Sequence, residues 1–127
     1  MNIYEEICRR AEEQREMMKV RRRDFHTYAE SGWFEIRTTS ILVDELKRMG
    51  YRVLNGRDIF KPEARMGVPP QEELDRQYER AVAQGAIQPY AREAKDGFTG
   101  AVAILECGEG PVIGMRFDID ALGVFDL

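Results

Sequence analysis

The chain has 127 residues, enough for one hydrophobic core, and we treat it as a single structural unit. Hydrophobic residues make up 43% of it and charged residues 33%, which excludes the apolar-poor composition of a disordered chain. The net charge of -4 and the pI of about 5.1 disfavour nucleic acid and anionic membrane surfaces as partners.

The first expected element is a long amphipathic helix from residue 2 to about residue 25. Its apolar stripe is thin and consists of Ile3, Ile7, Ala11, Met18 and Phe25. Glu and Arg residues three or four positions apart predict an ion-paired, solvated opposite face. A coiled coil is disfavoured, because the heptad pattern is not sustained.

A second helix is predicted from about residue 40 to residue 49. The hydroxyl residues Thr38, Thr39 and Ser40 are suited to capping its start. Gly50 stands where a left-handed residue commonly ends a helix. A short strand at residues 51–54 follows, closed by the turn sequence Asn55-Gly56.

Residues 56–97 form a connection that is longer than compact domains normally contain, and prolines interrupt it. Such a stretch needs structure of its own. Prolines at the entrance and acidic residues in the first turn predict a helix from about residue 70 to residue 84, ended by Gly85.

The pattern beyond Phe98 is typical of β structure. Residues 101–106 and 112–117 are mostly apolar runs separated by a Gly-Glu-Gly-Pro turn, which predicts a hairpin. Apolar residues at successive positions favour strands inside a sheet that is covered on both faces. With the preceding helices as cover, the fold class is a layered α/β arrangement.

Segments that would change the cellular compartment are not evident in the sequence. The N-terminus lacks a signal-peptide pattern, and no apolar run approaches the roughly 20 residues of a membrane span. Cys8 and Cys107 lie far apart and have no metal-ligand spacing, so we expect reduced thiols. By default these observations indicate a cytoplasmic location.

Two groups of residues could carry chemistry. Asp118 and Asp120 follow a predicted buried strand, and in open α/β sheets ligands bind beyond the carboxyl ends of strands. Side chains two positions apart would point the same way if the strand continued, and paired carboxylates can bind a metal or raise one another's pKa. An Asp-x-Asp after a strand is more often a turn or a helix cap.

The second group is the single histidine, His26, with Glu30 one helical turn later and Glu35 beyond. A His and a Glu at this spacing can share a metal, but no third ligand is evident. A histidine that is hydrogen-bonded at a helix end is the favoured interpretation.

The order of these motifs resembles the opening of the dinuclear-metal amidohydrolases, which include aminoacylases, hippurate hydrolases, auxin-conjugate hydrolases and aminobenzoyl-glutamate hydrolases. The resemblance covers nearly the whole chain and rests on the segments 22–35, 38–39, 46–51, 97–100 and 116–122. The connection at residues 56–97, together with Phe117 and Gly123, is most similar to the aminobenzoyl-glutamate type.

The resemblance implies that residues 1–127 are the N-terminal part of a three-layer α/β/α catalytic domain of the zinc-exopeptidase kind, with an insertion at about 56–97. It implies two divalent metal ions, zinc or manganese, whose ligands would lie downstream of this chain. Asp120 resembles the acid that supports the metal centre, and Asp118 stands where related peptidases place a His ligand. His26 and Glu30 match a structural His-x-x-Pro-Glu element in which Ala29 replaces the proline.

The implied function is hydrolysis of an N-acyl or aryl amide of an amino acid, by a full-length protein that is a homo- or heterodimer. The chain alone is expected to be inactive and to bind no metal firmly. A different class of function is a non-catalytic α/β interaction module that pairs with another chain through its sheet edge. Downstream sequence would separate these two interpretations.

Overall fold

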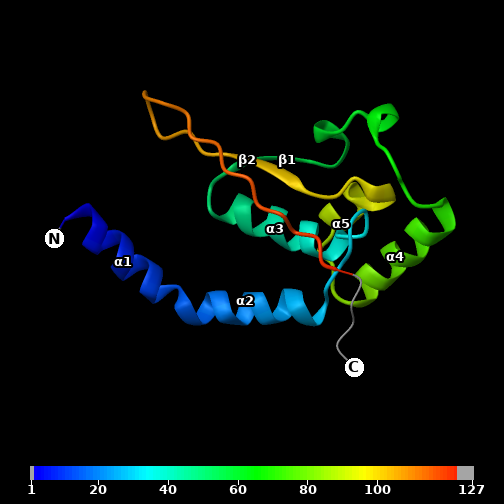
Figure 1. The fold of residues 1–127 in the computed structure, drawn as a ribbon, viewed down its shortest axis with the longest axis horizontal. Helices are drawn as coiled ribbons and strands as arrows, with labels where there is room; N and C mark the ends of the chain where they lie inside the picture. The colour runs from blue at the N-terminus through cyan, green and yellow to red at the C-terminus, as the bar shows by residue number, and fades with distance from the viewer. Residues whose placement is uncertain (1, 123–127) are drawn as a thin grey trace.

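The computed structural model describes residues 2–122 and contains five helices, two strands and three short 3-10 turns within that range (Figure 1). The helices are α1 (Ile3–Glu13), α2 (Arg15–Thr27), α3 (Ile36–Arg48), α4 (Gln71–Ala83) and α5 (Tyr90–Glu93). The strands are β1 (Arg52–Asn55) and β2 (Ala101–Ile104), and the turns are η1 (Gly56–Ile59), η2 (Pro62–Ala64) and η3 (Lys95–Gly97).

The predicted long N-terminal helix is in fact two helices, α1 and α2, which meet at Gln14. Asn2 and Glu5 form a capping box at the start of α1, with reciprocal bonds of 3.0 and 2.9 Å. The ion-paired face is confirmed, for example between Glu12 and Arg15 at 2.7 Å. Neither helix contains a buried residue.

Helix α3 is the central element, and it begins at Ile36, earlier than the capping pattern predicts. Residues 36–41 and Val43 are buried, including the hydroxyl residues that were expected to lie at the helix entrance. Gly50 has a φ of 93°, which confirms the predicted left-handed end of this helix.

The sheet has two antiparallel strands, with Arg52 opposite Ile104 and Asn55 opposite Ala101. The predicted hairpin between residues 101–106 and 112–117 is therefore wrong, because β2 pairs with β1 and residues 111–122 contain no strand. Helix α3 lies against the sheet in Figure 1, whereas Val102 is 44% exposed. The sequence predicted a sheet with both of its faces covered by other elements, and within residues 2–122 this arrangement is not formed.

The inserted connection packs against α3 through α4 and α5. Helix α4 matches the prediction within one residue at each end, and Gly85 ends it with a φ of 90°. Ile36 of α3 meets Ala81, Ala91 and Ala94 in the buried core. Small residues let these helices approach closely, which places the polar side chains of α4 beside the start of α3. No helix within residues 2–122 is long and apolar enough to cross a membrane.

Candidate functional site

The segment that contains the two candidate acids is held to the body of the protein by its backbone. The amide of Ala121 donates a 2.7 Å hydrogen bond to the carbonyl oxygen of Glu30. This contact brings the residue after Asp120 to the turn that precedes α3. The sequence-predicted acids and the predicted Glu30 element are thus brought together in the structure.

The two acids themselves do not form a paired site. Asp118 is exposed, and its carboxylate lies 2.6 Å from the guanidinium of Arg116. Asp120 is also exposed. The expectation that both side chains point the same way depended on a continuing strand, and residues 111–122 have no strand.

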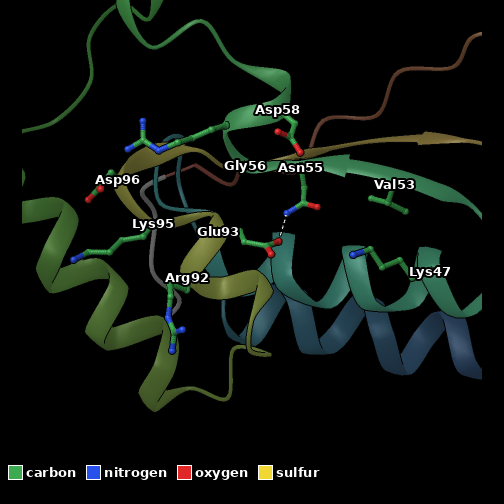
Figure 2. Close-up of a pocket in the computed structure, with 10 residues that line it drawn as sticks. Lys47, Val53, Asn55, Gly56, Asp58, Arg92, Glu93, Lys95 and Asp96 are labelled. Carbon is green, nitrogen blue, oxygen red and sulfur yellow. Dashed lines mark hydrogen bonds between the residues drawn. The ribbon is translucent and has the colours of Figure 1, made fainter.

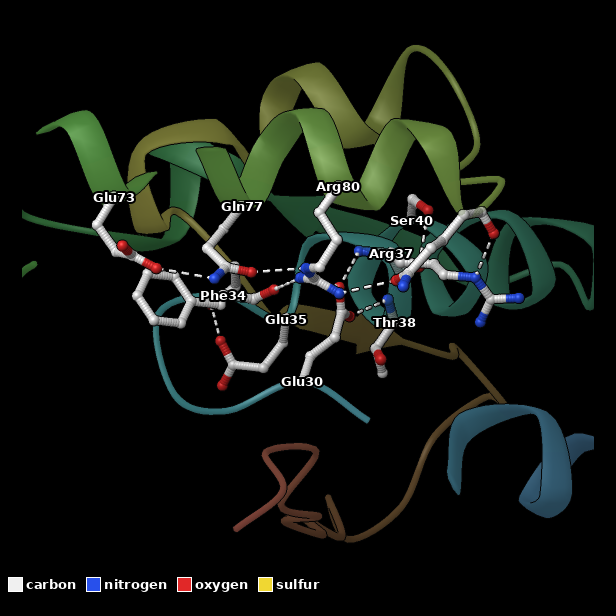
Figure 3. Close-up of polar contacts among 11 residues, drawn as sticks. Glu30, Phe34, Glu35, Arg37, Thr38, Ser40, Glu73, Gln77 and Arg80 are labelled. Atoms are coloured by element: carbon white, nitrogen blue, oxygen red, sulfur yellow. Dashed lines mark hydrogen bonds and ion pairs between the residues drawn. The ribbon is translucent and has the colours of Figure 1, made fainter. Parts of the chain in front are cut away.

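Glu30 is a buried carboxylate that caps α3 from outside the helix (Figure 3). Its two oxygens accept hydrogen bonds from the backbone amides of Arg37, at 3.1 Å, and Thr38, at 2.7 Å. These amides belong to the first turn, where no intrahelical acceptor exists and where the helix dipole favours a negative charge. The capping by Glu30 explains why α3 starts before the hydroxyl cluster.

The charge of Glu30 is balanced by Arg80, which reaches it from the last turn of α4. The Arg80 guanidinium lies 2.9 Å from the Glu30 carboxylate and 3.2 Å from the carbonyl oxygen of Phe34. The same guanidinium donates hydrogen bonds to the side chains of Gln77 and of Gln84, the C-cap residue of α4. The buried carboxylate thus has both hydrogen-bond donors and a counter-charge, as a buried charge requires.

Glu35 is a second buried carboxylate close to the acidic segment. It accepts a 2.8 Å hydrogen bond from the hydroxyl of Thr99. Burial raises the pKa of Glu35, and the negative charges of Asp120 and Glu30 raise it further, against the opposing effect of hydrogen bonds. The hydrogen bond from the amide of Ala121 to the carbonyl oxygen of Glu30 places Asp120 close to the same turn.

The other side of the turn is fixed by Arg37, which is buried. Its guanidinium binds both carboxylate oxygens of Asp24 on α2, at 2.8 and 3.0 Å, and donates to the carbonyl oxygen of Gln84 at 2.8 Å. The same group stacks on the ring of Tyr28 at 4.2 Å. The hydrogen bonds from Arg37 lower the pKa of Asp24. Arg37 therefore joins α2, α3 and the end of α4.

His26 and Glu30, which the sequence places one helical turn apart, lie in different environments. His26 is exposed in the last turn of α2, whereas Glu30 is buried against α3 and α4. No cluster of three or more His, Cys, Asp or Glu side chains placed to bind a metal occurs within residues 2–122. The donor set of these described residues therefore does not fit a metal centre.

A polar hollow of about 480 Å³ lies between β1, η1 and the α5–η3 region (Figure 2). Asn55 donates a 2.6 Å hydrogen bond to Glu93 across it. Charges of both signs line the hollow: Lys47, Arg57, Arg92 and Lys95 against Asp58, Glu93 and Asp96. This mixture indicates a solvated surface groove without selectivity for a ligand of either charge.

Several residues of the site could not be identified by motif spacing. Arg80 lies 50 positions from Glu30, and Thr99 lies 64 positions from Glu35. One feature of the sequence does point to Arg80. Polar residues at positions 77, 80 and 84 share the inner side of a packed helix, which predicts that a charged partner is buried beside them. Nothing in the sequence indicates which carboxylate that partner is.

Comparison with known proteins relates this chain to hydrolases of amino-acid conjugates. No protein-family model matches the chain. Over 102 residues it is 47% identical to one of the subunits of p-aminobenzoyl-glutamate hydrolase from Escherichia coli and 45% identical to indole-3-acetyl-aspartic acid hydrolase of Enterobacter agglomerans. Each alignment covers 80% of this chain but 23% of the relative, so the aligned region spans less than a quarter of the relatives' length.

A solved structure shows the same relation. The aminobenzoyl-glutamate utilization protein of Klebsiella pneumoniae matches with a TM-score of 0.70 and 43% identity, over 72% of this chain and 23% of that one. At this identity the match concerns homologous chains and not the fold alone. The resemblance drawn from the motifs is therefore confirmed: this chain is homologous to p-aminobenzoyl-glutamate hydrolase and to indole-3-acetyl-aspartic acid hydrolase.

Proposed function

We propose that this chain is the N-terminal part of the catalytic domain of a metal-dependent amidohydrolase that cleaves an N-acyl or aryl amide of an amino acid. The observation that carries the proposal is the 47% identity over 102 residues to p-aminobenzoyl-glutamate hydrolase. The three-layer α/β/α architecture and the cytoplasmic location belong to the same proposal. The alternative of a non-catalytic interaction module is not favoured by these comparisons.

The substrate class follows from the chemistry that the named relatives share. p-Aminobenzoyl-glutamate and indole-3-acetyl-aspartate each join an aromatic acyl group through an amide bond to an acidic amino acid. We therefore propose a small amide of this kind, with glutamate or aspartate on the amine side, as the substrate of the complete enzyme. The partner expected for that enzyme is a second protomer, in a homo- or heterodimer.

The contribution of this chain is to position an acid, and the metal ions are not held by its residues. Two divalent ions, zinc or manganese, are part of the proposal through the family resemblance alone. Within this chain, the Glu30 carbonyl accepts a hydrogen bond from the amide of Ala121 and so holds the end of the Asp118–Asp120 segment. Asp120 is the proposed positioning acid for the metal centre, and Asp118 is a weaker candidate. By themselves the 127 residues are proposed to hydrolyse no amide.

A chimera tests the proposal. In this chimera all 127 residues replace the corresponding part of the homologous E. coli p-aminobenzoyl-glutamate hydrolase chain. The chimeric chain is assembled into the E. coli enzyme. Hydrolysis of p-aminobenzoyl-glutamate and of indole-3-acetyl-aspartate is then measured. We expect hydrolysis of at least one of them well above the rate of the chain alone. A chimera that folds and assembles but hydrolyses neither amide overturns the proposal.

A further inference from the structure

The segment that carries the candidate acids depends on one contact for its position. Residues 111–122 contain no helix or strand. Within residues 2–122, the backbone hydrogen bond that ties this segment to the rest of the chain runs from the amide of Ala121 to the carbonyl oxygen of Glu30, at 2.7 Å. Asp120 immediately precedes Ala121, so its position depends on where the Glu30 backbone lies.

The turn that begins at Glu30 contains a residue in an unfavourable backbone conformation. Trp33 has a φ of 73°, which lies in the left-handed region that bulky side chains rarely adopt. Such a conformation costs free energy and persists only where the surrounding contacts enforce it. One of these contacts comes from the inserted connection, because a Cβ added at Gly97 would lie 3.3 Å from the Trp33 ring.

A second contact from the inserted connection bridges the two ends of the turn (Figure 3). Nη2 of Arg80 donates hydrogen bonds to the Glu30 carboxylate, at 2.9 Å, and to the carbonyl oxygen of Phe34, at 3.2 Å. Its Nε and Nη1 atoms donate to Gln77 and Gln84, at 2.6 and 2.9 Å. A guanidinium is a rigid planar fork, so the bonds to the two glutamines set the direction in which Nη2 meets the turn.

We propose that Arg80 is a positioning residue for Asp120 in the complete enzyme, acting through the Glu30–Phe34 turn and the bond from Ala121 to Glu30. The proposal rests on the proposed function, because it concerns the same site. It gives the inserted connection a part in the reaction without contact with the substrate. An arginine that served stability alone would change the amount of folded enzyme and leave the turnover of each folded, metal-loaded molecule unchanged.

A double-mutant cycle in the chimera tests the proposal, with kcat expressed per metal-loaded enzyme. Arg80→Lys keeps a positive charge for Glu30 but loses the planar fork that also reaches Phe34. We expect Arg80→Lys to lower kcat about 10-fold at unchanged KM, as for other groups that orient a metal-site residue. In the Asp120→Asn background the same substitution should have no further effect. An unchanged kcat, or equal losses in the two backgrounds, overturns the proposal.

The matched control is Arg76→Lys, which makes the same substitution one turn earlier on α4. Arg76 pairs with Glu73 at the surface, and its side chain is 67% exposed. We expect this variant to keep the kcat of the parent chimera. A loss equal to that of Arg80→Lys contradicts the assignment to Arg80.

Hydrogen exchange in the free 127-residue chain provides a measurement that needs no activity. The reference is the amide of Tyr51, which is bonded to the carbonyl oxygen of Leu46 at the far end of α3. We expect Arg80→Lys to speed exchange of the Ala121 amide about 10-fold relative to this reference, because local opening of the turn exposes the first amide alone. Equal acceleration of both amides reports general destabilisation and overturns the proposal.

The two measurements separate this inference from the proposed function. A folded chimera that hydrolyses neither amide overturns the proposed function, and the exchange of Ala121 then still decides whether Arg80 holds the acidic segment. A chimera that is active and does not respond to Arg80→Lys overturns this inference alone.

Discussion

The guanidinium of Arg80 on α4 lies 2.9 Å from the carboxylate of Glu30, whose side chain is completely buried. The same carboxylate caps α3, and the backbone carbonyl of Glu30 accepts a hydrogen bond from the amide of Ala121. Glu30 therefore holds both the start of α3 and the end of the segment that contains Asp118 and Asp120. Arg80, which belongs to the inserted connection, balances the charge of Glu30.

The first prediction concerns Arg80. Arg80→Met leaves the Glu30 carboxylate buried without a counter-charge, so we expect a loss of about 3–5 kcal/mol in the free energy of unfolding. Arg76→Met is the control on the same helix, because it removes a surface ion pair with Glu73 and should cost about 0–1 kcal/mol. Urea unfolding of the chain measures both. An Arg80→Met chain within about 1 kcal/mol of the parent contradicts the assignment, and adding Glu30→Gln should recover part of the loss.

The second prediction concerns Glu35, whose pKa is raised by burial and by neighbouring negative charges. A carboxyl with a raised pKa binds its proton more tightly in the folded state, so its stabilising effect is present at acidic pH and is lost as pH rises through the raised pKa. Glu35→Gln remains neutral at all pH values. The stability of this variant relative to the parent should increase from about pH 4 to about pH 8, as measured by urea unfolding at each pH.

The control for this experiment is Glu72→Gln, which removes an exposed carboxylate and reports the effect of the change in net charge alone. A relative stability of Glu35→Gln that stays constant across the same pH range would show that Glu35 is not protonated more readily in the folded chain.

The third prediction concerns Gly56, at the turn between β1 and η1. A Cβ at this position would lie 2.8 Å from the carbonyl oxygen of Glu93, and the residue has a φ of 61°. Gly67 has a similar φ of 71° with open space around it. Gly67→Ala should cost about 1–2 kcal/mol from the left-handed backbone. Gly56→Ala should cost a further 1–3 kcal/mol, approximately, from the steric overlap. Thermal and urea unfolding of both variants check the difference, and equal losses would contradict the close approach.

The fourth prediction concerns Asp120 and is made for the chimera. If Asp120 orients a metal-binding side chain of the complete enzyme, Asp120→Asn should lower turnover about 10- to 100-fold while the thermal midpoint stays unchanged. Asp118→Asn should have a smaller effect, because its exposed carboxylate is paired with Arg116. Measuring the turnover and the metal content of both variants shows whether Asp120 supports the metal centre or has a structural role only. A fully active, fully metallated Asp120→Asn enzyme would leave Asp120 as a structural residue.

Local signals in the sequence determined several elements. Prolines and acidic residues marked the start of α4, and glycines with positive φ marked the ends of α3 and α4. Strands β1 and β2 also lie within the ranges that their composition indicated, to within one residue. These features depend on residues that are close in the chain, and capping, backbone conformation and periodicity act over that distance.

Tertiary structure alone decided which elements meet. Residues 101–104 pair with the strand at 52–55 and not with the neighbouring run at 112–117, because packing against α3 brings two distant strands together. The partners of Glu30 and Glu35 likewise come from α4 and from Thr99, which are distant in sequence. A buried charge is satisfied by whichever group the packed helices place beside it, and residue spacing does not encode that choice.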